Sequence, residues 1–255
     1  RWIYNAPRKY VVEQAYDENN GVLCGIVSSD KVYEHILSNN PKNLGDIIEG
    51  QSFVIDGMKV TIISPDVDKL NQLREKYSNH RPLCKSEIDK ASVEAGSVMD
   101  DYFIPLQKFN LDYFQEDTSV ENASSIAAVF EYDDKRILWL SDSVPSVVMK
   151  SLFMLGFSET NKMYCDAVLL SHHGSAANNS LALLRMIQAD KYIISADGMN
   201  GHCLPNKETI ARIVSASSNL PVTLYFNYED GRLIKMFKSD AQEDVKSRID
   251  VHYLK

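Results

Sequence analysis

Histidine and aspartate residues follow three apolar runs of this chain, at the point where each run ends. Asp142 comes directly after residues 137–140, the pair His172-His173 follows residues 167–170, and His202 comes shortly after the run "YIIS". Because loops at one edge of a layered α/β sheet converge, we expect these side chains to lie close together. Neutral imidazole and carboxylate groups are the ligands that zinc and manganese take in hydrolytic sites. The order and spacing therefore predict a divalent-metal site.

Each of these residues has an expected role in that site. Asp142 is the predicted bridging ligand, and His172, His173 and His202 are predicted as metal ligands or as catalytic donors to the transition state. A metal lowers the pKa of a bound water and polarises the ester under attack, and two-metal sites hold their ions about 3.5–4 Å apart. Taken singly, an aspartate after a strand is usually a cap or turn residue. We call the three strand-end positions (Asp142, His172-His173 and His202) stations, and together they favour the functional interpretation.

Two further residues are expected to support the ligands. Asp197, which follows the run before His202, is predicted to hold a ligand histidine in place. Ser175, after Gly174, is expected either to cap the next helix or to hydrogen bond a ligand, while Gly174 lets the backbone turn sharply.

The elements that must position these residues alternate between strands and helices. Turn signals at Asp56-Gly57 and Asp133-Asp134 predict two β-hairpins, and Glu229-Asp230-Gly231 predicts a third. The apolar spacing predicts helices over 28–40, 66–77, 144–156, 180–190 and 207–217, and strands over 165–171 and 191–197. This alternation indicates an α/β fold with a mixed sheet.

Residues 78–121 interrupt this pattern. The segment is polar and acidic with scattered aromatic residues, and its only expected element is a short helix near 86–94. We therefore divide the chain into a first αβ part (1–77), an insertion or linker (78–121) and a second αβ part with the metal-site loops (122–255). The insertion is expected to be a solvated connector, with a lid over the site as the alternative.

Composition limits the class of protein. The chain has 255 residues, 44% of them hydrophobic, and a formal net charge of −8, which argues against a broadly basic nucleic-acid clamp. The negative net charge does not argue against an enzyme that acts on nucleic acid, because bound metal ions supply local positive charge. Four cysteines without a CxxC pair, no bilayer-spanning apolar run and no leader predict a cytoplasmic protein that does not associate with membranes.

Four motifs of the second part resemble those of a known family. They are "NASS" (Asn122 to Ser125), "LSDS" (Asp142), "CDAVLLSHHGS" (Asp166, His172, His173) and "NGHCLP" (His202, Pro205). In this order they are similar to the later part of metallo-β-lactamase-fold hydrolases, in particular the branch typified by the last domain of the ComEC-type DNA-uptake proteins. The resemblance implies an αββα sandwich, here without its first portion, and two Zn²⁺ ions, with Mn²⁺ as the alternative. It also implies that Asn122, Ser125 and Asp166 hold the metal ligands in place without binding the metal themselves.

The chain departs from the family pattern in three places. Ser141 stands where the family has glycine, and two residues separate His202 from Pro205. The opening His-x-His-x-Asp-His motif, which supplies most first-metal ligands in the family, is absent. Since Arg1 is not an initiator methionine, we expect that motif on a preceding segment or on a separate chain, with regulatory proteolysis or homo-oligomerisation as further expectations; the alternative is a degenerate, metal-free relative.

The resemblance implies a metal-dependent phosphodiesterase. The expected activity is that of a nuclease on DNA, in a bacterial antiviral defence system, and it requires the missing ligand motif. Two alternatives remain: a catalytically inactive sandwich that acts as an interaction subunit, and a hydrolase of small phosphoesters.

Overall fold

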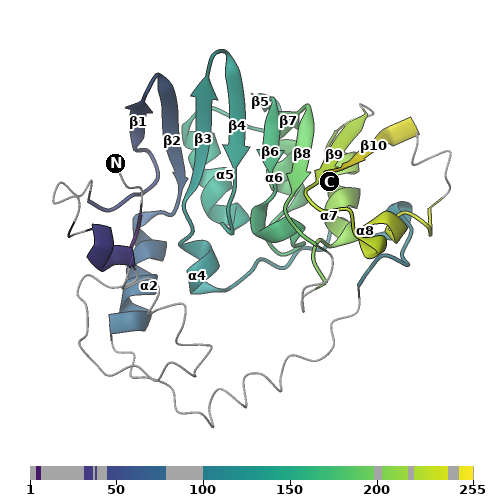
Figure 1. The fold of residues 1–255 in the computed structure, drawn as a ribbon, viewed down its shortest axis with the longest axis horizontal. Helices are drawn as coiled ribbons and strands as arrows, with labels where there is room; N and C mark the ends of the chain where they lie inside the picture. Colours follow the sequence, from purple (N-terminus) through teal and green to yellow (C-terminus); the bar gives the residue numbers. More distant parts are fainter. Residues whose placement is uncertain are drawn as a thin grey trace, which may run out of the picture.

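A large mixed sheet forms the centre of the molecule in a computed structural model, which describes residues 4–6, 32–36, 38, 45–78, 100–197, 203–217, 221–240 and 247–254. Eight strands run in the order β1-β2-β3-β4-β6-β8-β9-β10 (Figure 1). The first four are antiparallel neighbours, and the pairs from β4 to β10 are parallel. Their bounds are β1 (Ser52–Ile55), β2 (Met58–Ser64), β3 (Ala127–Tyr132), β4 (Lys135–Trp139), β6 (Ala167–Leu169), β8 (Lys191–Ile194), β9 (Val222–Phe226) and β10 (Ile249–Tyr253). The α/β class is therefore confirmed.

Tight turns join the antiparallel strands where the sequence predicts them. Asp56 and Gly57 both have positive φ angles, of 49° and 85°, and so do Asp133 and Asp134, with 48° and 58°. Two consecutive residues with positive φ are the signature of the type I′ turn, whose twist matches that of the strands. The first two predicted hairpins are confirmed.

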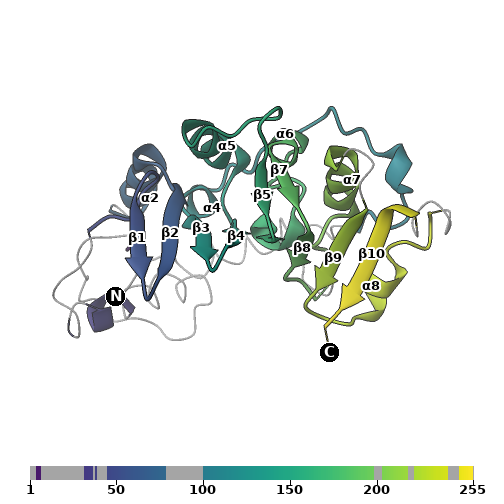
Figure 2. The ribbon, with the colours of Figure 1, turned by 90° about the horizontal axis from the view of Figure 1, so that it is seen from above.

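Four helices cover one face of the sheet. Figure 2 shows α2 (Val67–Ser78), α5 (Pro145–Met154), α6 (Leu181–Arg185) and α7 (Lys207–Ala216) on the same side. Fully buried strand residues such as Leu138, Val168 and Leu224 join the main hydrophobic core on this side. The remaining short helices are α4 (Val120–Ala123), α8 (Gly231–Lys235), η1 (Leu106–Lys108) and η2 (Ser171–Gly174).

The opposite face of the sheet is also apolar. Phe130, Ile137, Trp139, Leu169 and Ile193 share this face, because they are cross-strand partners or alternate along one strand. Ile137 is 39% exposed and Trp139 is 47% exposed, whereas the intervening Leu138 is fully buried. An apolar surface therefore extends across the centre of the sheet.

The predicted helix over 180–190 is too long. Helix α6 ends at Arg185, and strand β7 (Ile187–Ala189) follows at once. The chain becomes extended there because β7 pairs with β5 (Met163–Cys165) in a separate two-stranded parallel sheet. This pairing is a tertiary contact that the helical spacing does not reveal.

The third predicted hairpin is wrong. After β9 the chain forms α8, and the Asp230 carboxylate caps it by accepting a hydrogen bond from the N–H of Arg232 (2.7 Å). Leu233 and Met236 are both fully buried, and their spacing of three residues is helical. Strand β9 lies between β8 and β10, and both are parallel to it; β10 comes from the end of the chain.

The connecting segment, residues 100–119, is docked on the molecule. Tyr102 is 8% exposed, and its hydroxyl donates to the carbonyl of Pro205 (3.1 Å). The two carboxylate oxygens of Asp101 accept from the N–H groups of Lys207 (2.8 Å) and Glu208 (2.9 Å), at the beginning of α7. The expectation of a solvated connector is therefore wrong for this segment. The helix expected near 86–94 lies outside the described residues.

No helix among the described residues is long and apolar enough to cross a membrane.

Candidate functional site

Neighbouring strand exits bring Asp142 and the histidine pair to the same edge of the sheet. Strands β4 and β6 are parallel partners, so Asp142 and His172 follow adjacent strands in the same direction. The N–H of His172 donates to the carbonyl of Ser141 (2.7 Å), which ties the two exits together. Asp142 is half-buried, and its carboxylate has no hydrogen-bond or ion-pair partner among the described residues. The predicted convergence of these two stations therefore agrees with the structure.

The histidine pair occupies a strained turn. His172 (φ 45°, ψ 55°) and His173 (φ 57°, ψ 21°) are both left-handed, and Gly174 continues the turn with φ 86°. This conformation costs a residue with a Cβ roughly 1–2 kcal/mol. Strain of this kind persists only where the surroundings enforce it, and it concentrates at functional sites.

Buried polar side chains enforce the turn. Asn179 is fully buried; its Oδ1 accepts from the N–H of Ser171, and its Nδ2 donates to the carbonyls of Ser171 and Ser175 (both 2.8 Å). The Gly174 carbonyl accepts from the hydroxyl of Thr209 (2.8 Å). The hydrogen bonds of Asn179 and Thr209 could not be predicted from the sequence, because they form only once the loop is folded.

His173 presents Nε2 outward. Its Nδ1 lies 2.6 Å from the carbonyl oxygen of Ser195, which can only accept a hydrogen bond. Nδ1 therefore carries the hydrogen of the neutral ring, and the lone pair lies on Nε2. Because the side chain is exposed, that lone pair is accessible to a ligand.

His172 is held by a polar network. Its Nδ1 lies 3.1 Å from Oδ1 of Asn178, 3.3 Å from Nδ2 of Asn122 and 3.6 Å from Oδ2 of Asp117. Both amides donate Nδ2 to the Asp117 carboxylate, at 2.6 Å from Asn122 and 3.1 Å from Asn178. Since Asn178 points its Nδ2 at the carboxylate, it points its oxygen at the imidazole. The nearest partner of Nδ1 is thus an acceptor, which favours hydrogen on Nδ1 and the lone pair on Nε2, whereas the more distant Nδ2 of Asn122 is a donor.

The carboxylate of this network is ionised. Burial raises the pKa of Asp117, but hydrogen bonds from Asn122, from the N–H of Ser119 (2.8 Å) and from Asn178 outweigh that effect and lower the pKa below its usual value. A fixed negative charge therefore stands behind His172. The sequence did not indicate Asp117, because the connecting segment has no period from which to place it.

Two of the other predicted supporting residues have local roles. Ser175 is buried and its Oγ accepts from the N–H of Ala177 (3.2 Å) within the turn, whereas Ser180 caps α6 through the N–H of Leu183 (3.1 Å). Ser125 donates its N–H to the carbonyl of Asn122 (3.0 Å) just after α4.

Asp166 lies away from the histidine pair. It precedes β6, whereas His172 follows that strand, so the two residues stand at opposite ends of it. Its carboxylate pairs with Lys135 (2.9 Å) and accepts from the N–H of Arg136 (2.8 Å). The expectation that Asp166 supports the metal ligands is therefore wrong.

The third station is only partly described. Asp197 is exposed and comes just after β8, the next strand beyond β6. His202 lies outside the described residues. Within the described ranges, no group of three or more His, Cys, Asp and Glu side chains is close enough to hold a metal ion. The donor types fit zinc, but the described donors alone do not make a complete ligand set.

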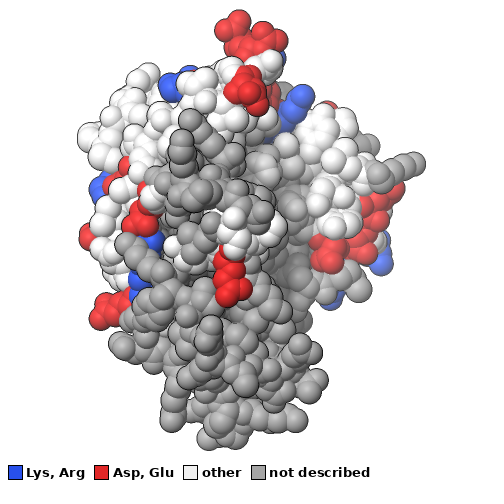
Figure 3. Space-filling view, turned by 60° about the vertical axis from the view of Figure 1, so that its left-hand side comes forward, with Lys and Arg blue, Asp and Glu red and all other residues white. Residues whose placement is uncertain are grey.

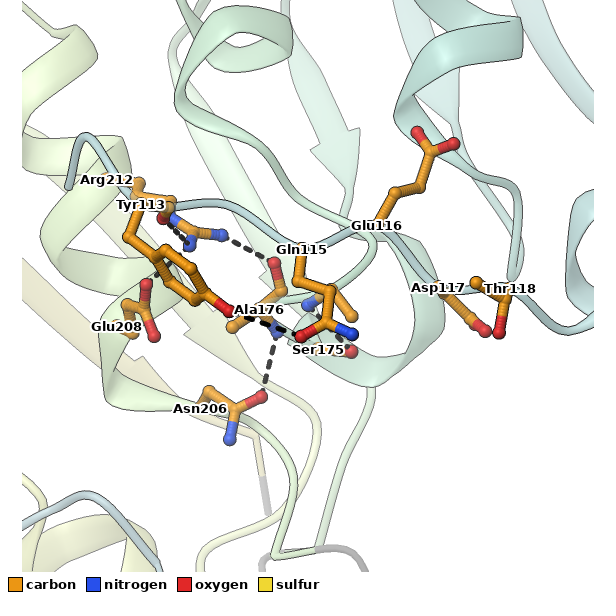
Figure 4. A pocket seen from close by; sticks show the side chains of 11 residues that line it. Tyr113, Gln115, Glu116, Asp117, Thr118, Ser175, Ala176, Asn206, Glu208 and Arg212 are labelled. Atoms are coloured by element: carbon orange, nitrogen blue, oxygen red, sulfur yellow. Dashed lines mark hydrogen bonds and ion pairs between the residues drawn. The ribbon is translucent and has the colours of Figure 1, made fainter.

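A polar pocket of about 460 Å³ adjoins the network. Arg212, Glu208 and Tyr113 lie at one end of it, and Asp117 and Thr118 lie at the other (Figure 4). Arg212 is 2% exposed; its guanidinium pairs with Glu208 and donates to three backbone carbonyls, those of Tyr113, Ala176 and Asn179. This arginine therefore joins the connecting segment to the loop that follows the histidine pair.

The described part of one face of the molecule is mixed in charge. On the face in Figure 3, acidic side chains form small groups with basic ones between them, and the described part of this face carries no continuous basic area. This distribution agrees with the formal net charge of −8.

No protein-family model matches the chain, and no curated protein and no solved structure is significantly similar to it. The resemblance described above therefore depends on the motifs alone.

Proposed function

We propose that the chain contributes to the metal site of a phosphodiester hydrolase of the metallo-β-lactamase fold that acts on DNA. One observation carries the proposal: two adjacent imidazoles both have Nδ1 engaged and Nε2 without a partner among the described residues, and the half-buried Asp142 follows the neighbouring strand exit, which is hydrogen bonded to theirs. This is the usual preparation of a ligand histidine, whose other ring nitrogen is fixed by a hydrogen-bond acceptor.

Sheet geometry supports the sandwich fold. Helices cover one face of the sheet, and the other presents Phe130, Ile137, Trp139, Leu169 and Ile193. In an αββα sandwich a second sheet covers such a face, because apolar surface must be buried against another layer. We propose that the first portion of the fold supplies that sheet together with the remaining ligands, and that His202 completes the third station.

Charge supports the use of metal ions. A chain with a net charge of −8, and no continuous basic area on the described part of the face in Figure 3, attracts the phosphodiester backbone of DNA weakly. A bound pair of divalent ions would supply the attraction, lower the pKa of a water and polarise the phosphodiester. The contribution of this chain is to bring Asp142, His172 and His173 to one edge of the sheet, with hydrogen bonds to Nδ1 of both imidazoles.

The test uses the protein expressed from its whole gene, with zinc and manganese content and plasmid cleavage measured for each variant. Asp142→Asn should lose metal and should lower cleavage by at least about 100-fold, as expected for removal of a metal-site group. Asp166→Asn is the matched control, since this carboxylate lies at the other end of β6, and it should keep both properties.

Two outcomes would overturn the proposal. Protein without zinc or manganese whose cleavage is untouched by Asp142→Asn would favour the inactive interaction subunit. Metal-bound protein that leaves plasmid and single-stranded DNA intact but hydrolyses a small aryl phosphodiester would favour the small-phosphoester hydrolase.

A further inference from the structure

Two stacked aromatic rings lie on the last strands of the sheet. Ile193 of β8 pairs with Tyr225 of β9, which pairs in turn with His252 of β10. These side chains therefore share the sheet face of Trp139 and Leu169. The rings of Tyr225 and His252 are nearly parallel, with an interplanar angle of 13° and centroids 4.7 Å apart. The row of side chains across this face thus changes from apolar residues to an aromatic stack at β9.

The stack is closed on its inner side and open on its outer side. Nζ of Lys191 lies 5.9 Å from the centroid of the Tyr225 ring, within reach of a cation–π interaction. Because Lys191 belongs to β8 and His252 to β10, they lie on opposite sides of Tyr225. Strand β10 is the last of the sheet (Figure 1), and the side chain of His252 is 44% exposed. The ring face of His252 that points away from Tyr225 is therefore accessible.

Polar side chains mark this end of the face as exposed to water. Lys191, Thr223 and Asp250 form a cross-strand row beside the stack. The side chain of Asp250 is 66% exposed, and its Oδ2 lies 2.9 Å from Nε2 of His252. A layer packed over β9 and β10 would remove these groups from water, which is costly. The second sheet proposed above therefore covers the apolar part of the face and leaves the stack accessible.

Hydrogen bonds join the stack to the histidine pair. The carbonyl of Ser195 accepts from Nδ1 of His173 (2.6 Å), and its Oγ accepts from Nδ2 of Asn227 (3.2 Å), which follows Tyr225 by two residues. Strand β10 lies two strands beyond β8, or roughly 10 Å at about 4.8 Å per strand. A DNA strand bound at the histidine pair therefore reaches the stack within a few nucleotides.

Resting on the proposed function, we propose that Tyr225 and His252 form a subsite that stacks an unpaired nucleobase of the DNA substrate on the outer face of His252. Proteins that bind single strands use aromatic rings in this way, because every base has a π-face. Lys191 and Asp250 carry opposite charges beside the stack, so the subsite offers a ring face rather than a net attraction for phosphate. The ligand is therefore a single strand that is recognised through its bases.

The test measures the binding of a fluorescein-labelled, single-stranded oligothymidylate by anisotropy. It uses the protein expressed from its whole gene and freed of metal with EDTA, so that the strand is not cleaved. His252→Leu and His252→Phe are a matched pair, because both side chains are apolar but only phenylalanine has a ring face. His252→Leu should weaken binding by about 5–150-fold, the factor that corresponds to roughly 1–3 kcal/mol per stacked base. His252→Phe should bind as tightly as the wild type.

Two controls separate stacking from other effects. On an abasic strand of the same length, the weakening caused by His252→Leu should disappear, because no base remains to stack. Tyr132→Leu should bind oligothymidylate like the wild type: Tyr132 is 58% exposed, but it lies beside the β3–β4 turn, at the opposite end of β4 from Asp142. If His252→Leu does not fold, His252→Thr replaces it, since threonine suits a strand.

Three results would overturn the proposal. They are a folded His252→Leu protein that binds oligothymidylate like the wild type, an equal loss of affinity for the abasic strand, and a wild type that does not bind oligothymidylate.

The binding measurement needs neither metal nor cleavage. If the protein binds no zinc and cleaves no plasmid, the proposed function fails, but the anisotropy still shows whether the stack binds a base. If metal content and cleavage are as proposed and His252→Leu binds like the wild type, only the stacking subsite is contradicted.

Discussion

Gly174 lies so close to Pro205 that a Cβ on Gly174 would stand 2.7 Å from Cβ of Pro205. This contact joins the turn that carries the histidine pair to the chain that follows the third station. The glycine also has a φ angle of 86°, which disfavours every residue with a side chain. For both reasons, the geometry of this loop requires glycine at position 174.

Gly174→Ala should therefore destabilise the protein by about 2 to 5 kcal/mol, since the left-handed conformation costs roughly 1–2 kcal/mol and overpacking roughly 1–3 kcal/mol. Urea unfolding of the variant measures the change. Gly156→Ala is the matched control: Gly156 has a φ of 91°, but a Cβ there would meet nothing within 4 Å. It should lose only about 1–2 kcal/mol. Equal losses at the two positions would contradict the contact with Pro205.

Short-range signals account for the part of the fold that was predicted. Asp56-Gly57 and Asp133-Asp134 mark their hairpins because two consecutive positive φ angles suit these residue types. The strand exits of β4 and β6 could be placed for a similar reason, since an apolar run followed by Asp142 or by His172 is visible in the sequence itself.

Long-range contacts account for what was missed. Strand β7 exists because it pairs with β5, and β10 pairs with β9 across α8 and the residues beyond it. Asp117 comes from a segment without periodicity, and only the folded chain brings it to His172. The supporting role of Asp166 came from the motif resemblance, and the motif does not show that strand β6 separates this residue from His172.

A buried ion pair fastens the connecting segment to the rest of the molecule. Nζ of Lys207 lies 2.5 Å from Oδ2 of Asp240; the lysine side chain is fully buried and the aspartate side chain is 6% exposed. Nζ also donates to the carbonyl of Tyr102 (3.3 Å), and Oδ1 of Asp240 accepts from the N–H of Leu106 (2.6 Å). The pair thus links α7 and the chain after α8 to the connecting segment.

Lys207→Met should cost about 3–5 kcal/mol, because it leaves the Asp240 carboxylate buried without a counter-charge. Thermal or urea unfolding measures the loss. The double variant Lys207→Met/Asp240→Asn removes the unpaired charge but keeps an acceptor for Leu106, and it should recover a large part of the stability. A double variant that is less stable than the single one would show that the charge of Asp240 has another partner.

Arg212 is expected to be irreplaceable by lysine. Its planar guanidinium donates to the carbonyls of Ala176 (in the loop), Asn179 (3.0 Å) and Tyr113 (3.3 Å), a spread that one ammonium group cannot reach. Arg212→Lys should destabilise the protein by about 2 to 4 kcal/mol, because buried carbonyls lose their donors. Arg185→Lys on the exposed side of α6 is the control and should change stability by less than about 0.5 kcal/mol. A loss of stability at Arg212 no larger than that at Arg185 would show that the hydrogen bonds of the Arg212 guanidinium do not stabilise the fold.

Acid should weaken the contact between α2 and α4. Burial raises the pKa of Glu121, but hydrogen bonds from Lys76 (2.6 Å) and from the hydroxyl of Tyr77 outweigh it and lower the pKa to about 2. A carboxyl with a lowered pKa in the folded state stabilises that state above its ordinary pKa, which is 4.5 here. This stabilisation should be lost as the pH falls from about 4.5 to about 2.

Glu121→Gln should therefore be less stable than the wild type at neutral pH, and the difference should shrink as the pH falls through that window. Urea midpoints measured from neutral pH down to pH 2 test this, as far as the rest of the protein stays folded. Glu159→Gln, at an exposed residue, is the control and should run parallel to the wild type throughout. A constant difference between Glu121→Gln and the wild type across the window would mean that Tyr77 and Lys76 hold the protonated carboxyl as well as the ionised one.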